Sequence, residues 1–198
     1  TTIKSPTVGE VITATDQTHS SDHGFNPAGQ DPDALIGEIV TYTATITIPE
    51  GTTPLFHYLI TLPRGMAFIP LSTVAGDGIT TSAALSTAAA GGSTGVFATD
   101  FLAGVIGDVG GAAIDAGRTL DFNFGTITNS NTANGTPETI VLTYRAVVLN
   151  IDGNTAGKVL TDGSTASWTG NGTGTASDDN TDLNTVVVIH PTLSITKT

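Results

Sequence analysis

The stretch from residue 40 to residue 48 constrains the fold more than any other part of this sequence. It reads Val40-Thr41-Tyr42-Thr43-Ala44-Thr45-Ile46-Thr47-Ile48, so apolar side chains alternate with threonines. A period of two places the apolar residues on one face of a β-strand and the threonines on the other. The stretch therefore predicts a strand with one face in a core and the other in water.

The rest of the chain favours the same class of structure. Threonine occupies 37 of the 198 positions, and there are only 6 Lys and Arg residues. β-Branched residues favour strands, while the best helix formers are scarce. Short apolar segments separated by Gly, Asn, Asp and Pro predict further strands at 55–62, 66–69, 119–127, 138–150, 161–169 and 185–189. We expect an all-β protein with a β-sandwich fold.

A length near 200 residues is enough for one domain with a single core. We assign residues 1–190 to that domain, with loop insertions at 14–34 and 75–117. The first insertion is rich in Ser, Gly, Asn, Pro and Asp, which is loop chemistry. The second is rich in Ala and Gly, and a short helix within 81–90 or 99–106 is one expectation for it. Residues 191–198 would form a junction or a donor strand leading to the next unit.

Charge and composition exclude several functions. The formal net charge is -12 and the chain has no Cys. With so few bases, nucleic acid is not an expected partner, and without Cys neither thiol catalysis nor a Cys-ligated metal is available. No apolar run reaches the roughly 18 residues of a membrane helix. No nucleophile elbow or phosphate-binding loop is present either, so we expect no enzyme activity.

Several spaced motifs resemble a known repeat class. They are Gly37 to Thr52, Leu62 to Phe68, Leu120 to Asn129 and the closing Val188 to Thr198. Together they resemble the Ig-like conserved repeats, DUF11-like or of the isopeptide-forming fimbrial D2 type, of large bacterial cell-surface and secreted proteins. The resemblance implies an extracellular, non-catalytic structural or adhesive repeat that serves as a stalk or scaffold. Its partners would be neighbouring copies or repeats, and a surface glycan or protein ligand.

Two alternatives to a tandem repeat stay open. In the first, the chain is a filament subunit that donates an end segment, such as Val186 to Lys197, to the next copy. Leu193 and Ile195 alternate there with small polar residues, as a donated edge strand requires. In the second, the chain is a carbohydrate-binding module of a secreted protein, which would need an exposed aromatic platform.

The resemblance also implies a self-formed cross-link between a Lys of the first strand and a carboxyl or amide of a late strand. Lys4 and Asp162 occupy the corresponding positions, with Glu38 or Asp121 as the assisting acid. An apolar interior would favour the neutral amine of a Lys and the protonated form of a carboxyl, which is what such a bond requires. The alternative is a surface Lys and a turn Asp.

Acidic turns near the C-terminal end predict a calcium site. Asp178, Asp179 and Asp182 lie within six residues, and Asp152 precedes a Gly-Asn turn. Carboxylate oxygens are the ligands that Ca²⁺ prefers, and the extracellular setting implied by the resemblance supplies the ion. No run matches the twelve-residue EF-hand loop, and the alternative is that these acids are solvated turn residues. We expect no other cofactor.

Overall fold

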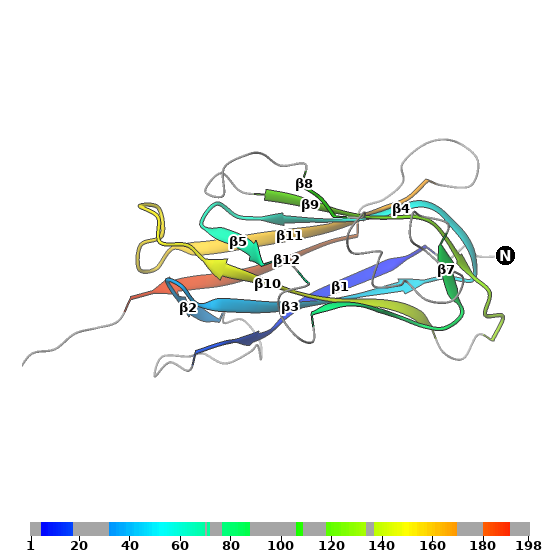
Figure 1. Ribbon diagram of the computed structural model, residues 1–198, viewed down its shortest axis with the longest axis horizontal. Helices are drawn as coiled ribbons and strands as arrows, with labels where there is room; N and C mark the ends of the chain where they lie inside the picture. Colours follow the sequence, from blue (N-terminus) through cyan, green and yellow to red (C-terminus); the bar gives the residue numbers. More distant parts are fainter. Residues whose placement is uncertain are drawn as a thin grey trace, which may run out of the picture.

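The computed structural model describes residues 5–17, 32–69, 71, 77–87, 106–108, 118–133, 137–169 and 180–190. These residues form two β-sheets that pack face to face (Figure 1). The first sheet has five strands in the order β1-β3-β10-β5, and β6 also pairs with β10. Its members are β1 (Thr7–Thr15), β3 (Ile39–Ile48), β10 (Glu138–Val148), β5 (Met66–Ile69) and β6 (Gly78–Thr81).

The second sheet has seven strands in the order β2-β12-β11-β4-β9-β7, and β8 also pairs with β9. Its pairings are antiparallel except for that of β2 with β12. Its members are β2 (Asp33–Leu35), β12 (Asn180–Ile189), β11 (Val159–Ser167), β4 (Gly51–Leu62), β9 (Arg118–Asn129), β7 (Leu85–Thr87) and β8 (Ile106–Asp108).

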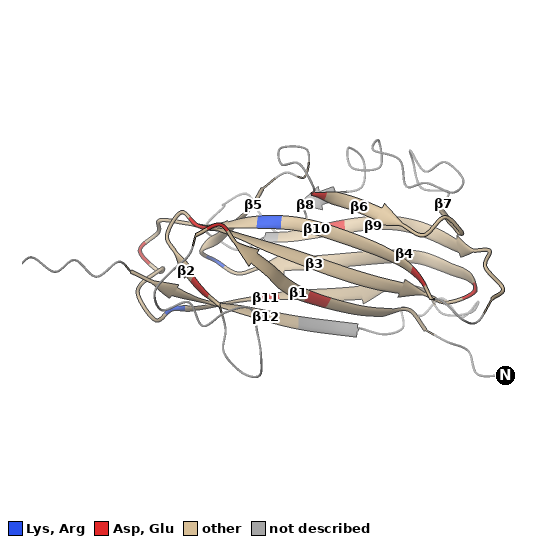
Figure 2. Ribbon diagram, turned by 90° about the horizontal axis from the view of Figure 1, so that it is seen from below, with Lys and Arg blue, Asp and Glu red and all other residues tan. Residues whose placement is uncertain are grey.

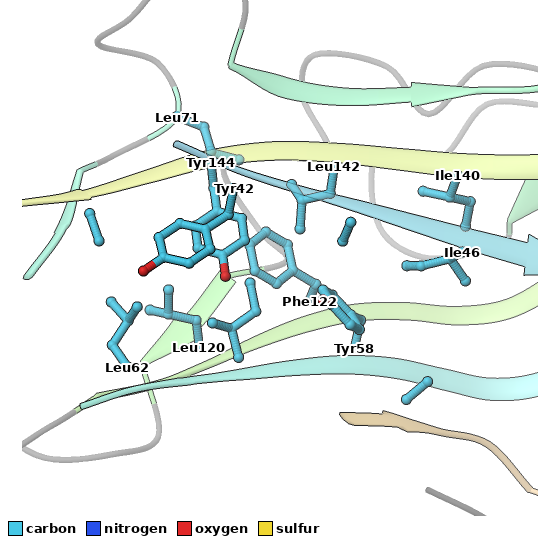
Figure 3. Packing of buried hydrophobic residues seen from close by; sticks show 14 of the residues in the cluster. Tyr42, Ile46, Tyr58, Leu62, Leu71, Leu120, Phe122, Ile140, Leu142 and Tyr144 are labelled. Carbon is cyan, nitrogen blue, oxygen red and sulfur yellow. The ribbon is translucent and has the colours of Figure 1, made fainter. Parts of the chain in front are cut away.

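Alternation along the strands places the core between the sheets. On β3 the apolar residues of the 40–48 stretch are buried, while Thr41, Thr43, Thr45 and Thr47 face outward. The rings of Tyr42 and Tyr144 stack with centroids 4.9 Å apart, and Figure 3 shows them side by side in the core. The largest fully buried side chains are aromatic: Tyr42, Tyr58, Tyr144, Phe56, Phe122 and Phe124.

The first and last described strands reach opposite ends of the sandwich. Thr7 of β1 pairs with Thr47 at the end of β3, whereas Ile189 of β12 pairs with Leu35, just before β3 begins. The length of β3 between these points is about 30 Å at the usual rise per residue. In Figure 1 the N-terminal end of β1 lies on the right and the end of β12 on the left.

The structure confirms the predicted all-β sandwich and strands in all seven predicted regions. It corrects the helix expected within 81–90, because 78–81 and 85–87 pair as strands with β10 and β9. The 99–106 alternative lies outside the described residues except for Ile106, which belongs to β8. β4 begins at Gly51, before Pro54, and the ladder shifts register there as a β-bulge. The described part of the chain contains no helix long and apolar enough to cross a membrane.

Charge is distributed unevenly over the described surface (Figure 2). Two acids on the outer sheet surfaces are paired with bases. Asp121 lies 2.9 Å from His57 Nδ1, and Asp77 lies 2.9 Å from Arg145 Nε. Of the other acids whose side chains are described, Glu10 and Asp162 lie in the core and the rest lie at the strand ends: Asp16 and Asp152 with the buried Asp33 and Glu38 at one end, and Glu50 and Glu138 at the other.

A glycine and an asparagine lock the loop between β10 and β11 against the turn before β5. Asn154 is buried, and its Nδ2 donates hydrogen bonds to the carbonyl oxygens of Gly65 and Leu149, both at 2.8 Å. Gly65 has φ = +108°, and a Cβ at this position would lie 2.2 Å from Asn154 Oδ1. The turn therefore needs glycine both for its backbone conformation and for the approach of Asn154.

Gly65→Ala should destabilise the chain more than Gly37→Ala. Gly37 also has a positive φ, of +89°, but a Cβ there would meet nothing within 4 Å. Both variants carry the cost of placing a non-glycine residue at positive φ. Gly65→Ala also adds a steric clash with Asn154, which costs about 1–3 kcal/mol. Urea unfolding of both variants measures the difference. Equal losses would show that Asn154 moves aside freely.

Candidate functional site

A glutamate points from β1 into the core. Glu10 is 2% exposed and lies on the inward face of β1, between Val8 and Ile12. Its Oε2 accepts a hydrogen bond from the Tyr58 hydroxyl, and its Oε1 accepts one from Asn184 Nδ2 at 3.2 Å. Glu10 thus connects the edge strand of the five-stranded sheet with β4 and β12 of the opposite sheet.

The second carboxyl group comes from β11. Asp162 is 1% exposed, and its carboxyl group lies next to that of Glu10, within reach of a shared proton. Its Oδ2 also accepts a hydrogen bond from the Tyr144 hydroxyl at 3.4 Å. Alternation on β11 explains the position, because Leu160, Asp162 and Ser164 all lie on its buried face. We call Glu10 and Asp162 the carboxyl pair.

Burial is the main cause of the electrostatic state of this pair. Burial, followed by the negative charge of Glu10 and hydrogen bonding with it, raises the pKa of Asp162 from 3.8 to about 9. Two carboxylates in contact inside a core cannot both be ionised without a large energetic cost. At neutral pH Asp162 therefore keeps its proton and hydrogen-bonds with Glu10 through it.

Three tyrosines surround the pair. Burial raises the pKa of Tyr42, Tyr58 and Tyr144, and the nearby carboxyl groups raise it further. Their hydroxyls thus stay protonated and act as donors: Tyr58 to Glu10, Tyr144 to Asp162 and Tyr42 to the sulfur of Met66, at 3.6 Å. Because all of these groups are buried, the cluster is closed to a substrate and its chemistry is the holding of a proton.

The structure brings only one of the predicted cross-link residues into this cluster. Lys4 lies outside the described residues. Glu38 accepts hydrogen bonds from the backbone amides of Leu35 and Gln17, near the start of β3. Asp121 lies on the outer face of β9 beside His57. The acid beside Asp162 is Glu10, which was not predicted from the sequence.

Glu10, Tyr58 and Asn184 were all missed from the sequence, although one signal was present. Val8, Glu10, Ile12 and Ala14 occupy alternate positions, so a charged residue stands where the period of two calls for a core residue. A glutamate in an inward register is the mark of a paired buried carboxyl. Its partners lie far apart in the sequence and only the fold brings them together.

The four aspartates predicted to bind calcium do not meet within the described chain. Asp178 and Asp179 lie outside it, and Asp182 is described by its backbone alone, as part of β12. Asp152 is exposed in the loop after β10. The same loop contacts β12 through the hydrogen bond that Gly157 N donates to Val188 O. Six residues of extended strand, about 20 Å, separate Asp182 from Val188. The described residues contain no group of three or more His, Asp or Glu side chains that could hold a metal.

The structure describes only the first part of the segment predicted for strand donation, Val186 to Lys197. Val186 and Val188 are buried, and their strand β12 lies between β11 and β2 of its own sheet. Donation cannot begin at Val186, because this part completes the core of its own unit. Leu193 and Ile195 lie outside the described residues, so the narrower prediction stands untested.

An aromatic platform for a sugar is not formed by the described residues. Trp168 is 9% exposed, and its ring stacks near that of Phe56 at 6.4 Å between centroids. The large apolar side chains that are exposed in this part of the chain are aliphatic: Val11, Leu55, Val159 and Leu183. The described aromatics therefore serve the core.

Comparison with known proteins finds distant structural similarity. No family model matches, and no curated protein matches. The pilus backbone RrgB of Streptococcus pneumoniae is 14% identical with a TM-score of 0.46, over 83% of this chain and 31% of that one. BcpA, the major pilin subunit of Bacillus cereus, is 12% identical with a TM-score of 0.46, over 93% and 41%.

The collagen-binding subdomain ACE19 of an Enterococcus faecalis surface protein is 10% identical, with a TM-score of 0.40, over 96% of this chain and 100% of that one. The chain thus spans well under half of each of the two pilins. Because identities and TM-scores are this low, function has to be inferred from the chain's own residues.

The carboxyl pair makes stability depend on pH in a defined direction. Between about pH 4 and pH 9 the folded chain holds a proton on Asp162 that the unfolded chain has lost. The free energy of unfolding should therefore fall by about 1.4 kcal/mol per pH unit from this group as pH rises through that window. Asp162→Asn, which donates a hydrogen bond without a titrating proton, should gain stability relative to the wild type between about pH 5 and about pH 8.

Urea unfolding at both pH values measures this gain. The matched control is Asp152→Asn, because Asp152 is exposed in a loop. That variant should follow the wild type at both pH values. An Asp162→Asn variant whose difference from the wild type is the same at both values would contradict the raised pKa.

Proposed function

We propose that this chain is a non-catalytic structural module of an extracellular or cell-surface protein, in which it extends a stalk or scaffold. The observation that supports the proposal most directly is the geometry of its outer strands. β1 starts at one end of the sandwich and β12 finishes at the other, about 30 Å further along β3. Units joined through these strands would lie in line rather than side by side.

The interior supports a structural role as well. The most unusual ionisable groups of the described chain, Glu10 and Asp162, are buried and hydrogen-bonded to each other rather than placed in an open cleft. A catalytic group must reach its substrate, whereas a satisfied buried polar group stabilises one arrangement of the core. The extracellular location comes from the sequence resemblance to bacterial surface repeats.

An in-line arrangement has a direct test. Two copies of the chain joined end to end should have a maximum dimension close to twice that of one copy, because entry and exit lie at opposite ends. Small-angle X-ray scattering of the single and the double chain measures both values. A double chain only slightly longer than the single one would contradict the stalk role, since it would show that neighbours fold back on each other.

The cross-link between Lys4 and Asp162 remains a proposal that intact mass can test. Formation of an amide between Lys Nζ and the Asp carboxyl carbon releases one water molecule, so the chain would be lighter by one water. Lys4→Ala would then show the full mass of its own sequence, with no loss of water. A wild-type mass equal to that of the sequence would leave Asp162 as the free carboxyl of the pair. Calcium binding stays a separate proposal, tested by the shift in melting temperature on chelation.

A further inference from the structure

One member of the carboxyl pair, Glu10, bridges the two strands through which a stretched unit would be loaded. β1 and β12 run in the same direction along the long axis, and the two strands are in contact. Pulling the start of β1 and the end of β12 apart would slide one strand along the other. Glu10 on β1 accepts a hydrogen bond from Asn184 Nδ2 on β12, at 3.2 Å, and this bond joins the two strands directly.

We infer that Glu10 is a buried clamp that holds β1 against β12 and β11 when the unit is pulled along its long axis. The inference rests on the proposed stalk function. The observation that supports it is that the single carboxylate of Glu10 contacts residues of three other strands. Among the described strands, backbone pairing holds β1 to β3 alone. Glu10 adds contacts with Asn184 on β12, Asp162 on β11 and Tyr58 on β4.

Burial makes such contacts effective under load. A hydrogen bond to an ionised group in a dry interior is stronger than a neutral one at the surface. Sliding β1 along β12 would break these bonds and leave the Glu10 carboxylate without partners in an apolar core, which is costly. Resistance should therefore be greatest in the direction that shears these two strands.

The clamp depends on the proton that Asp162 keeps. The groups that face the pair are Tyr42 on β3, Tyr58 on β4, Tyr144 on β10, Asn184 on β12 and Ser164 on β11. The tyrosines stay protonated, so loss of the Asp162 proton at alkaline pH would leave two adjacent carboxylates. Their repulsion would open the contact between β1 and β11.

Single-molecule stretching along two axes tests this inference. The chain has no Cys, so introduced cysteines give unique attachment points. Ser5→Cys with His190→Cys loads β1 and β12. Glu50→Cys with Asp152→Cys stretches the same sandwich end to end, from the turn between β3 and β4 to the loop after β10. Asn184→Ala removes the direct bond, and because Asn184 is only half-buried the variant should fold.

We expect Asn184→Ala to unfold about tenfold faster under load on the first axis, the factor typical of one lost hydrogen bond to a charged group, and to be unchanged on the second. The control is Asn129→Ala, which removes the 2.9 Å hydrogen bond from Asn129 on β9 to Ile48 O on β3, a bond that includes no atom of β1 or β12. It should show no preference for the first axis. Near pH 10 the wild type should weaken on the first axis, and Asp162→Asn should not.

Equal effects of Asn184→Ala on both axes, or none on the first, would overturn the clamp. Intact mass is measured first, because a covalent bond from Lys4 to Asp162 would bear the load itself and would also overturn it. A wild-type chain that unfolds at low force on both axes would instead contradict the stalk role. If the wild type resists force but unfolds at the same force as Asn184→Ala, the clamp is rejected and the stalk role is not.

Discussion

One shared proton decides whether the centre of this sandwich can close. Glu10 and Asp162 approach each other from opposite sheets, and burial raises the pKa of Asp162 to about 9. With the proton present, the pair is a hydrogen bond between the sheets; without it, the pair would be two charges in a dry interior. The hydroxyls of Tyr58 and Tyr144 donate to one oxygen of each carboxyl group, which ties the pair to the surrounding aromatic core.

Apolar residues of similar volume would also hold two sheets together. Replacement of buried polar groups by such residues is often neutral or stabilising, so the pair is not explained by stability alone. Its effect here is to fix the position of β1. Glu10 meets Tyr58, Asp162 and Asn184 in only one register, since a shift by one residue would turn it toward solvent. The edge strand is therefore aligned by polar contacts as well as by its ladder with β3.

The sequence predicted the strands whose two faces differ clearly and missed those whose faces are mixed. β3, β4 and β10 have an apolar inner face and a polar outer one, so a period of two is visible. β1 has Val11 outside and Glu10 inside, which hides its alternation. β2 and β6 to β8 have only three or four residues each, too few to show a period. The carboxyl pair was half predicted: Asp162 was selected through a family pattern, while its partner depends on a contact between residues 152 positions apart.

The placement of acids at the two ends of the sandwich has a consequence for how units would follow one another. The end acids whose side chains are described are Asp16 and Asp152, with the buried Asp33 and Glu38, on one side and Glu50 and Glu138 on the other, whereas Asp121 and Asp77 on the outer sides of the sheets lie beside bases. Ends of like sign repel over about 8–10 Å at physiological ionic strength. In a row of such units, this repulsion would lengthen each junction at low ionic strength. Added salt would screen the repulsion and let neighbouring units approach each other.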